Sequence, residues 1–278
     1  GTNKNVYATD EFTLPGTVIK TFTVQPTVAG VSAVAQLADH SSSNRTLTVN
    51  GTVAASTTQK KFGTHGLGTT AHNERLSVPA SSDWNFTSDW TFEMWIYRTG
   101  GGVGSYELMN FRSGSPGGGS GIRIFFESGK LKFNCNTIGL NTYLVSSSSN
   151  LDSAWHHIAI VRSGNSIKGY IDGSSDGTTL TASGNNTSTG TLHIVGDGDQ
   201  GFTGYMDETR ISNTARYTSN FTPSTTAFTP DANTLLLVHV NAQDAVDAQS
   251  MAFKIDGTAS ATQELTEGYT YELDVSDS

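Results

Sequence analysis

The sequence predicts an all-β protein, and three observations support this fold class. Charged residues make up only 15% of the 278 residues, below the roughly 25% of an average globular domain. Thr, Ser, Asn and 30 Gly take their place, and these residues favour strand surfaces and tight turns. Strand-length apolar runs recur between turn residues, whereas no window of about 11 residues carries a capped helical pattern.

The clearest strand is predicted at residues 90–98, where apolar and polar residues alternate. One face carries Trp90, Phe92, Met94 and Ile96, and the other carries Thr91, Glu93, Trp95 and Tyr97. Successive side chains of a strand point to opposite faces, so the first set is expected in the core. Because the second face is half aromatic, we expect a curved neighbouring layer to cover part of it.

Further strands follow along the chain, each bounded by Gly, Ser, Asn or Asp. They are predicted at residues 122–126, 130–136, 155–162, 166–172, 191–195 and 204–211. Residues 162–166 are expected to form a hairpin turn, and residues 212–217 a short turn of helix. Alternation in the second of these strands predicts that Cys135, the single cysteine, is buried beside Leu131 and Phe133, and one cysteine excludes an intrachain disulfide.

Charge and hydropathy argue against two classes of partner. The net charge is -9, and Lys and Arg are nowhere denser than in residues 59–61. Nucleic-acid binding needs clustered cations that displace counterions from phosphates. The longest apolar run, residues 235–238, is far shorter than the ~20 residues of a spanning helix. We therefore expect neither nucleic-acid binding nor membrane insertion.

Two groups of motifs follow one another along the chain. The first lies at residues 62–68, 74–79, 83–86 and 90–97, and the second includes WHHIAIVRSG at 155–164 and GYMDETRIS at 204–212. Together they resemble laminin-G-like domains of the concanavalin-A type. Residues 215–223 and 231–239 look like the version found in bacteriophage tail and fibre proteins. The resemblance implies an antiparallel two-sheet jelly-roll sandwich whose first strand, near residues 34–39, pairs with its last, near 235–239.

The expected organisation has three parts. Residues 1–32 are an N-terminal β segment or linker, residues 33–242 are the laminin-G-like sandwich, and residues 243–278 are a C-terminal β segment. The last of these resembles the start of a further β-sandwich module. Both ends are expected to continue into a longer parent polypeptide.

Catalytic chemistry finds little support in the sequence. Glucanases share the jelly-roll architecture, and glycoside hydrolysis needs two carboxylates ~5–10 Å apart. Glu93 is alone in its strand, whereas Asp207 and Glu208 are adjacent and should point to opposite faces. His156 and His157 should likewise point to opposite faces, which prevents them from sharing a metal ion. No serine-hydrolase elbow or zinc-protease helix motif occurs, so we predict a non-catalytic protein.

A calcium site is the leading candidate for a functional centre. Asp197 and Asp199 lie in a Gly-flanked loop, and Asp207 follows on the next strand. Calcium prefers carboxylate and carbonyl oxygens from loops, and many laminin-G-like relatives bind it at a loop rim. The alternative is that Asp197 and Asp199 solvate a turn while Asp207 hydrogen-bonds a neighbouring backbone.

Carbohydrate binding would require aromatic side chains that stack on sugar rings beside polar groups. The resemblance places all four tryptophans at packing positions: Trp84, Trp90, Trp95 and Trp155. Tyr106 and Tyr143, in variable loops, are the better candidates for contact with a sugar. The sequence assigns no residue to a ligand.

Two functional hypotheses remain. The first is a non-catalytic structural or adhesive module on the surface of a virion (tail, fibre or surface) or in an extracellular protein, oligomeric and assembled with partner chains. The second is a calcium-assisted, lectin-like domain that binds host or environmental glycans. The two are compatible, because a fibre can carry a lectin, and both place the protein on a virion surface or outside the cell.

Overall fold

The computed structural model describes the chain in several stretches. They are residues 35–99, 105–111, 121–135, 144–147, 151–182, 184–186, 190–196 and 200–242, with short strands at 12–14, 17–20, 251–255, 258–263 and 273–275. The chain divides into two compact units. One is Ala35–Asn241, and the other consists of Gly1–Val34 together with Ala242–Ser278.

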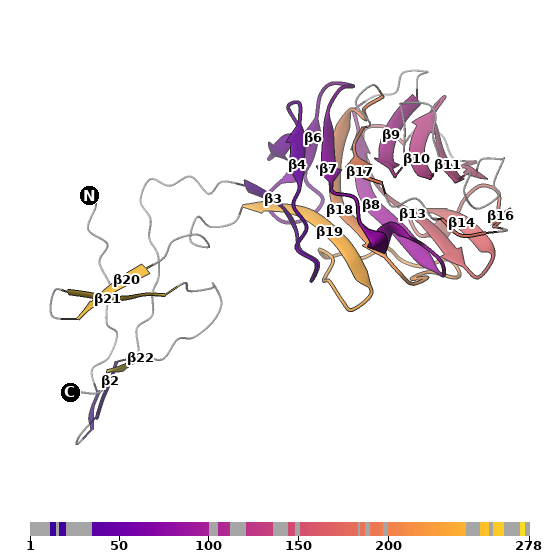
Figure 1. Cartoon of the computed structure of the whole chain (residues 1–278). Helices are drawn as coiled ribbons and strands as arrows, with labels where there is room; N and C mark the ends of the chain where they lie inside the picture. Colours follow the sequence, from indigo (N-terminus) through magenta and orange to yellow (C-terminus); the bar gives the residue numbers. More distant parts are fainter. Residues whose placement is uncertain are drawn as a thin grey trace. The chain divides into compact units, whose positions relative to one another are not determined.

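The larger unit is a sandwich of two sheets (Figure 1). The larger sheet runs in the order β15 (Ser174–Ser175), β14 (Ser166–Ile171), β13 (Trp155–Ser163), β8 (Trp90–Arg98), β18 (Gly204–Ser212), β19 (Thr234–Ala242) and β3 (Ala35–Asp39). Beside this path, β16 (Leu180–Thr181) pairs with β14, and β6 (Gly66–Thr69) pairs with β18 and with β5 (Ala54–Ser56).

The smaller sheet supplies the second layer. Its order is β12 (Leu144–Val145), β11 (Lys130–Cys135), β10 (Ile122–Glu127), β9 (Ser105–Asn110), β17 (Leu192–Ile194), β7 (Arg75–Val78) and β4 (Thr48–Asn50). Strand pairing in both sheets is antiparallel. The first strand of the sandwich, β3, lies beside the last, β19. The predicted all-β antiparallel sandwich and its strand closure are therefore confirmed.

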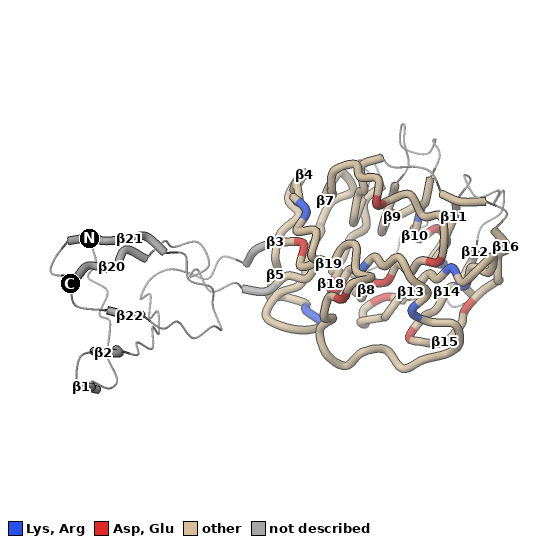
Figure 2. Tube along the Cα trace, turned by 60° about the horizontal axis from the view of Figure 1, so that its bottom comes forward, with Lys and Arg blue, Asp and Glu red and all other residues tan. Residues whose placement is uncertain are grey.

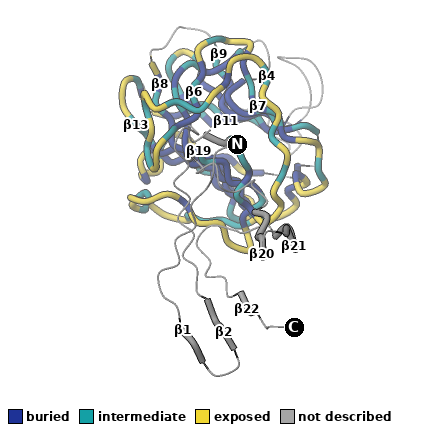
Figure 3. The backbone as a smooth tube through the Cα atoms, turned by 90° about the vertical axis from the view of Figure 1, so that its left-hand side faces the viewer, coloured by how far each residue is buried: buried dark blue, intermediate teal, exposed yellow. Residues whose placement is uncertain are grey.

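The core lies between the two sheets, where buried residues concentrate (Figure 3). Strand β8 supplies one face to it as the alternation predicts, with Trp90, Phe92, Met94 and Ile96 each at 0% exposure. Cys135 is also buried in this core, beside Leu131 and Phe133. The hairpin β13–β14 forms as expected, with Gly164 in the left-handed region at φ 59°.

The second face of β8 is covered differently from our expectation of a curved neighbouring layer. A segment without strands, residues 213–233, connects β18 to β19 and packs over the outer face of the larger sheet; we call it the strap. Its apolar side chains Ala215, Tyr217 and Phe221 pack on the β13–β14 hairpin, and Phe228 packs on Trp95. The strap thus covers the outer face of β8, where we expected a neighbouring layer.

The predicted helical turn at residues 212–217 was wrong. Strand β18 continues through Ser212, and backbone groups beyond it bond to other segments. The carbonyl of Thr214 accepts a bond from Thr91 Oγ1 (2.8 Å), and the N–H of Arg216 donates to the same hydroxyl (2.9 Å). A short 3-10 helix lies instead at Ser82–Trp84 (η1), capped by Ser81.

The other unit contains two small sheets. One has the order β1 (Phe12–Leu14), β2 (Thr17–Lys20), β22 (Leu273–Val275), and the other pairs β20 (Met251–Ile255) with β21 (Thr258–Gln263). The pairing of β2 with β22 joins the residues before the sandwich to those after it, which the sequence did not indicate. The three-part boundaries and the further module stay predictions. In the described part of the chain, no helix is long and apolar enough to cross a membrane.

Candidate functional site

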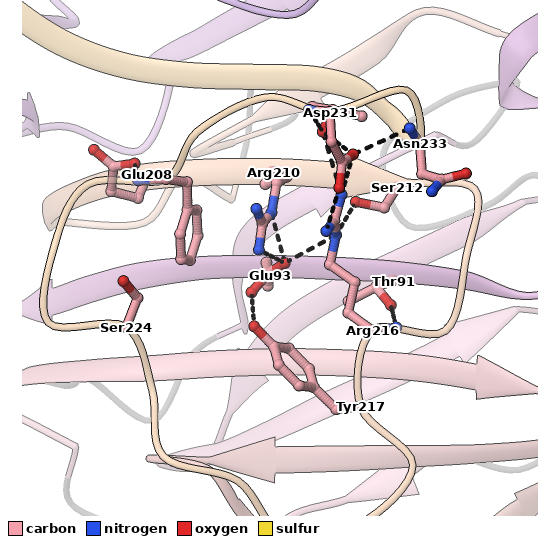
Figure 4. Close-up of polar contacts among 12 residues, drawn as sticks. Thr91, Glu93, Glu208, Arg210, Ser212, Arg216, Tyr217, Ser224, Asp231 and Asn233 are labelled. Carbon is pink, nitrogen blue, oxygen red and sulfur yellow. Dashed lines mark hydrogen bonds and ion pairs between the residues drawn. The ribbon is translucent and has the colours of Figure 1, made fainter.

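A buried charge cluster lies between the larger sheet and the strap. Charged residues are sparse along the described chain (Figure 2), yet Glu93 is completely buried on the outer face of β8. Its Oε1 accepts from Arg210 Nε (2.8 Å), and its Oε2 accepts from the Tyr217 hydroxyl (2.8 Å), as Figure 4 shows. His157 Nε2 lies 3.2 Å from the same Oε2. The polar positions of the β8 pattern therefore hold the strap to the sheet.

Glu93 is ionised inside this cluster. Burial alone would raise the pKa of Glu93, but the hydrogen bond with His157 and the positive charge of Arg210 outweigh it, so that its pKa is lowered. Burial, together with the negative charge of Glu93, raises the pKa of Tyr217. Glu93 is thus a carboxylate with a cationic partner and two further hydrogen-bonding partners, which is how a charge is tolerated inside a protein.

A second set of contacts holds the two ends of the strap together, and we call it the clasp. Arg216 near its start donates Nη1 and Nη2 to the two carboxylate oxygens of Asp231 near its end, at 3.0 and 2.8 Å (Figure 4). Arg216 Nε also donates to Ser212 Oγ (2.6 Å). The bidentate pair lowers the pKa of Asp231, and planar pairs of this kind fix orientation as well as charge.

The middle of the strap rests on the turn after β14. The N–H of Phe221 donates to the carbonyl of Gly173 (2.9 Å), and Asn220 Oδ1 accepts from the N–H of Ser175 (2.9 Å). The rings of Tyr217 and Phe221 stack, with their centroids 3.5 Å apart and 5° between their planes. This docking sets the position of the next residues, Pro223–Thr225.

Across the outer face from these residues, Asp207 positions the loop of residues 59–65. Asp207 Oδ2 accepts from the backbone N–H groups of Lys61 (3.0 Å) and Phe62 (3.1 Å). Burial raises the pKa of Asp207 to about 6, and the charge of Glu208 adds to this effect. Glu208 Oε2 accepts from the N–H of Phe228 in the strap (2.6 Å).

The expectation that Asp207 and Glu208 point to opposite faces was wrong. Their backbone partners, at Phe62 and Phe228, belong to residues of one apolar cluster around Trp95 on the outer face. The cause is a bulge in β18, where the pairing with β8 shifts and Glu208 adopts φ 51°. A bulge interrupts the two-residue period on which the expectation depended.

Of the predicted calcium ligands, only Asp207 can be placed. Asp197 and Asp199 lie outside the described residues, so the calcium site stays a prediction. No group of three or more His, Cys, Asp or Glu suited to a metal ion occurs in the described part of the chain. His156 and His157 do point to opposite faces: His156 Nδ1 lies 2.7 Å from Asp172 Oδ2, whereas His157 is buried beside Glu93.

An open depression of about 540 Å³ lies between the strap and the loop that Asp207 holds. Trp95 of β8 and Trp155 of β13 belong to the sheet beneath it. The residues that line it are Lys61, Phe62, Trp95, Trp155, Asp172, Pro223, Ser224 and Thr225. The depression therefore combines aromatic surfaces with a cation, a carboxylate and two hydroxyls.

The tryptophans divide into two classes. Trp84 and Trp90 are buried in the main core, as predicted for packing residues. Trp95 and Trp155 pack in the smaller outer cluster but also line the depression, so their interpretation as packing residues alone was incomplete. Each has an indole N–H that is shielded from solvent and has no hydrogen-bond partner among the described residues. The sequence did contain one signal for this second role. Trp95 alternates with residues whose side chains enter the core, so its own side chain was expected on the outer face of the sheet.

The two tyrosines favoured by the sequence lie elsewhere or cannot be placed. Tyr106 is half-buried on β9 in the smaller sheet and stacks on His72, with ring centroids 5.4 Å apart. Tyr143 lies outside the described residues. The depression, in contrast, is built from residues of five separate stretches of the chain that meet on the outer face of the larger sheet.

The chemistry of the depression suits binding. Among the described residues that line it, only Asp172 carries a carboxyl group, whereas glycoside hydrolysis requires two carboxylates that flank one bond. Asp172 Oδ1 accepts from the backbone N–H of His157 (2.9 Å), and Oδ2 contacts His156. Glu93 is buried and does not line the depression.

The fold and this arrangement define a jelly-roll sandwich with an open depression on one sheet. The model of the concanavalin A-like lectin/glucanase superfamily, in its laminin-G-like form, matches residues 67–221. The chain belongs to this superfamily. A search of curated proteins finds no significant match.

Two solved structures with a similar fold are the binding domain of Paraclostridial mosquitocidal protein 1 and the receptor-binding domain of botulinum neurotoxin D. Their sequence identities to this chain are 16% and 12%, and both TM-scores are 0.51. Each alignment covers 66% of this chain and 50% of the other, so the chain matches about half the length of these structures. At this level of sequence identity, the similarity shows that the fold is shared and nothing more.

Proposed function

We propose that the sandwich is a non-catalytic binding module that holds a saccharide in the depression between the strap and the loop of residues 59–65. The observation that carries the proposal is the lining itself, in which Trp95, Trp155 and Phe62 lie beside hydroxyls and charged groups. Sugars present apolar ring faces edged by hydroxyls, and mixed aromatic and polar surfaces complement them. The similar folds named above are the binding domain of a mosquitocidal protein and the receptor-binding domain of a botulinum neurotoxin, which supports a binding role.

The contacts around the depression suit recognition without large movement. The clasp of Arg216 with Asp231 and the cluster around Glu93 fix the strap on one side. On the other side, Asp207 fixes the backbone of Lys61 and Phe62. A binding surface whose parts are already held in place loses less entropy when a ligand binds.

A glycan array tests the proposal on the whole chain, with Trp155→Ala as the variant and Tyr106→Ala as the matched control. We expect wild-type binding to selected glycans and a loss of at least about tenfold in Trp155→Ala. Tyr106→Ala also removes a half-buried aromatic ring but leaves the depression intact, so its binding should stay at the wild-type level. A flat array with folded wild-type protein, or equal binding by Trp155→Ala, contradicts the proposal.

Calcium assistance by Asp197, Asp199 and Asp207 is a separate part of the proposal. The array and a thermal melt are repeated with calcium and with a chelator, and we expect a higher melting midpoint with calcium. Asp207, the described member of this set, is not among the residues that line the depression. An unchanged midpoint therefore contradicts the calcium site and leaves the saccharide site standing.

The setting that we propose is adhesion within a virion surface or another extracellular assembly of several chains. The support is the likeness of residues 215–223 and 231–239 to phage tail and fibre domains. Mass measurement of the purified chain is expected to show an ordered oligomer. A monomer at every accessible concentration contradicts self-assembly.

A further inference from the structure

We infer that the saccharide bound in the depression carries an acidic group, a carboxylate or a sulfate, which the ammonium group of Lys61 contacts. This inference rests on the proposed function and adds the chemical class of the ligand. Three features carry it: the position of Lys61, the hydrogen-bonding groups that can reach a ligand in the depression, and the charge of the whole chain.

Lys61 presents a positive charge that no carboxylate neutralises in the described structure. Its Nζ lies 3.8 Å from the ring centroid of Trp95 and 5.7 Å from that of Phe62. Those aromatic faces are its side-chain partners among the described residues, and the bond from its backbone N–H to Asp207 fixes where its side chain starts. The ammonium thus lies against an aromatic surface at the edge of the depression.

The groups that can reach a ligand in the depression are able to donate hydrogen bonds. The Lys61 ammonium donates and cannot accept, and the lining hydroxyl of Thr225 can donate as well as accept. The indole N–H groups of Trp95 and Trp155 are shielded from solvent and take no part in this argument. Asp172, the single carboxylate among the described lining residues, already bonds to His156 and to the backbone of His157. A ligand that supplies anionic oxygen acceptors complements this set better than a neutral one.

The charge of the chain limits how acidic the ligand can be. The protein carries a net charge of -9, which repels long polyanions before they reach a single lysine. One acidic group on an otherwise uncharged sugar meets Lys61 without that penalty. The complement of the depression is therefore an acidic sugar unit, not a polyanionic chain such as nucleic acid.

The test measures the affinity of the whole chain for three oligosaccharides with the same backbone: a neutral one, one with a carboxylate and one with a sulfate. We expect wild-type protein to bind at least one acidic form about tenfold more tightly than the neutral form. Raising the salt concentration from low to high should reduce this preference, since the contact is partly exposed. The arm with the larger preference identifies the acidic group.

Two variants and a control locate the effect. Lys61→Gln should abolish the preference with little change for the neutral sugar, whereas Lys61→Arg, which keeps the charge, should retain most of it. Lys60→Gln removes an exposed neighbouring charge outside the depression and should behave as wild type. Melting midpoints confirm that the variants are folded.

The outcomes separate the two proposals. If the neutral and acidic forms bind equally, or if Lys61→Gln keeps the preference, the acidic-ligand inference is overturned while saccharide binding stands. If no form binds to folded wild-type protein, the saccharide site itself is wrong. Binding that survives Trp155→Ala with its preference intact places the acidic sugar elsewhere on the chain and also overturns the inference.

Discussion

Replacing Glu93 with glutamine lowers the free energy of unfolding by about 3–5 kcal/mol in our expectation, the range for breaking a buried ion pair from one side. The substitution keeps the size of the side chain but removes the charge that faces Arg210. It also leaves His157 and Tyr217 with an altered partner. Urea unfolding followed by tryptophan fluorescence measures the loss.

Glu127→Gln is the matched control for this substitution. Glu127 pairs with Lys132 on the protein surface, and 42% of its side chain is exposed. Exposed pairs contribute about 0–1 kcal/mol, so this control should change stability little. Equal losses in the two variants would mean that the cluster under the strap has no special role in folding.

The charge of Glu93 also makes stability depend on pH. Its pKa is lower in the folded protein than its usual value of 4.5. The carboxylate therefore contributes stability above about pH 4.5, and that contribution is lost as the pH falls through the lowered pKa. The stability difference between wild type and Glu93→Gln should shrink as acid is added. A difference that stays constant from neutral pH down to pH 3 would mean that the pKa of Glu93 is the same in the folded and unfolded states, and would contradict the lowered pKa.

Gly173→Ala is expected to lower the free energy of unfolding by about 2–4 kcal/mol, because strain and collision act together. Gly173 has φ 78°, and a Cβ atom there would lie 1.9 Å from the carbonyl oxygen of Phe221. The strap must move away, and the Pro223–Thr225 wall of the depression moves with it. Affinity for the saccharide should therefore fall along with stability.

Gly164→Ala separates the two causes. Gly164 also lies in the left-handed region, at φ 59°, but nothing lies within 4 Å of the Cβ position. This control should cost only about 1 kcal/mol, the backbone penalty alone, with unchanged saccharide binding. If both glycine variants lose the same stability and both bind normally, close docking of the strap on Gly173 is not important.

The parts of the fold that the sequence predicts are those governed by local alternation. Residues Trp90–Arg98 show their core face directly, and β8 has the predicted bounds. The strap could not be found in this way, because a segment without strands or helices has no period. Its attachment depends on Glu93 and Tyr217, which are 124 residues apart. Contacts of that kind arise from the tertiary fold and leave no local pattern.

The candidate site was hidden for the same reason. Lys61 and Phe62 reach the depression because Asp207, almost 150 residues later, accepts their N–H groups. The bulge at Glu208 reverses the face expected from a two-residue period. Trp155 looked like a packing residue because it occurs in a strand motif, and only its place on the outer sheet face reveals a second role.

The clasp between Arg216 and Asp231 has a consequence for engineering and for evolution. Phe221 and Phe228 are anchored inside it, so residues 222–227 form an interchangeable cassette whose two ends are held by bonds outside it. Sequence in the cassette can change while the framework stays folded, much as hypervariable loops change on a constant scaffold. Variants randomised at these positions should therefore include proteins with new binding specificities and little loss of stability.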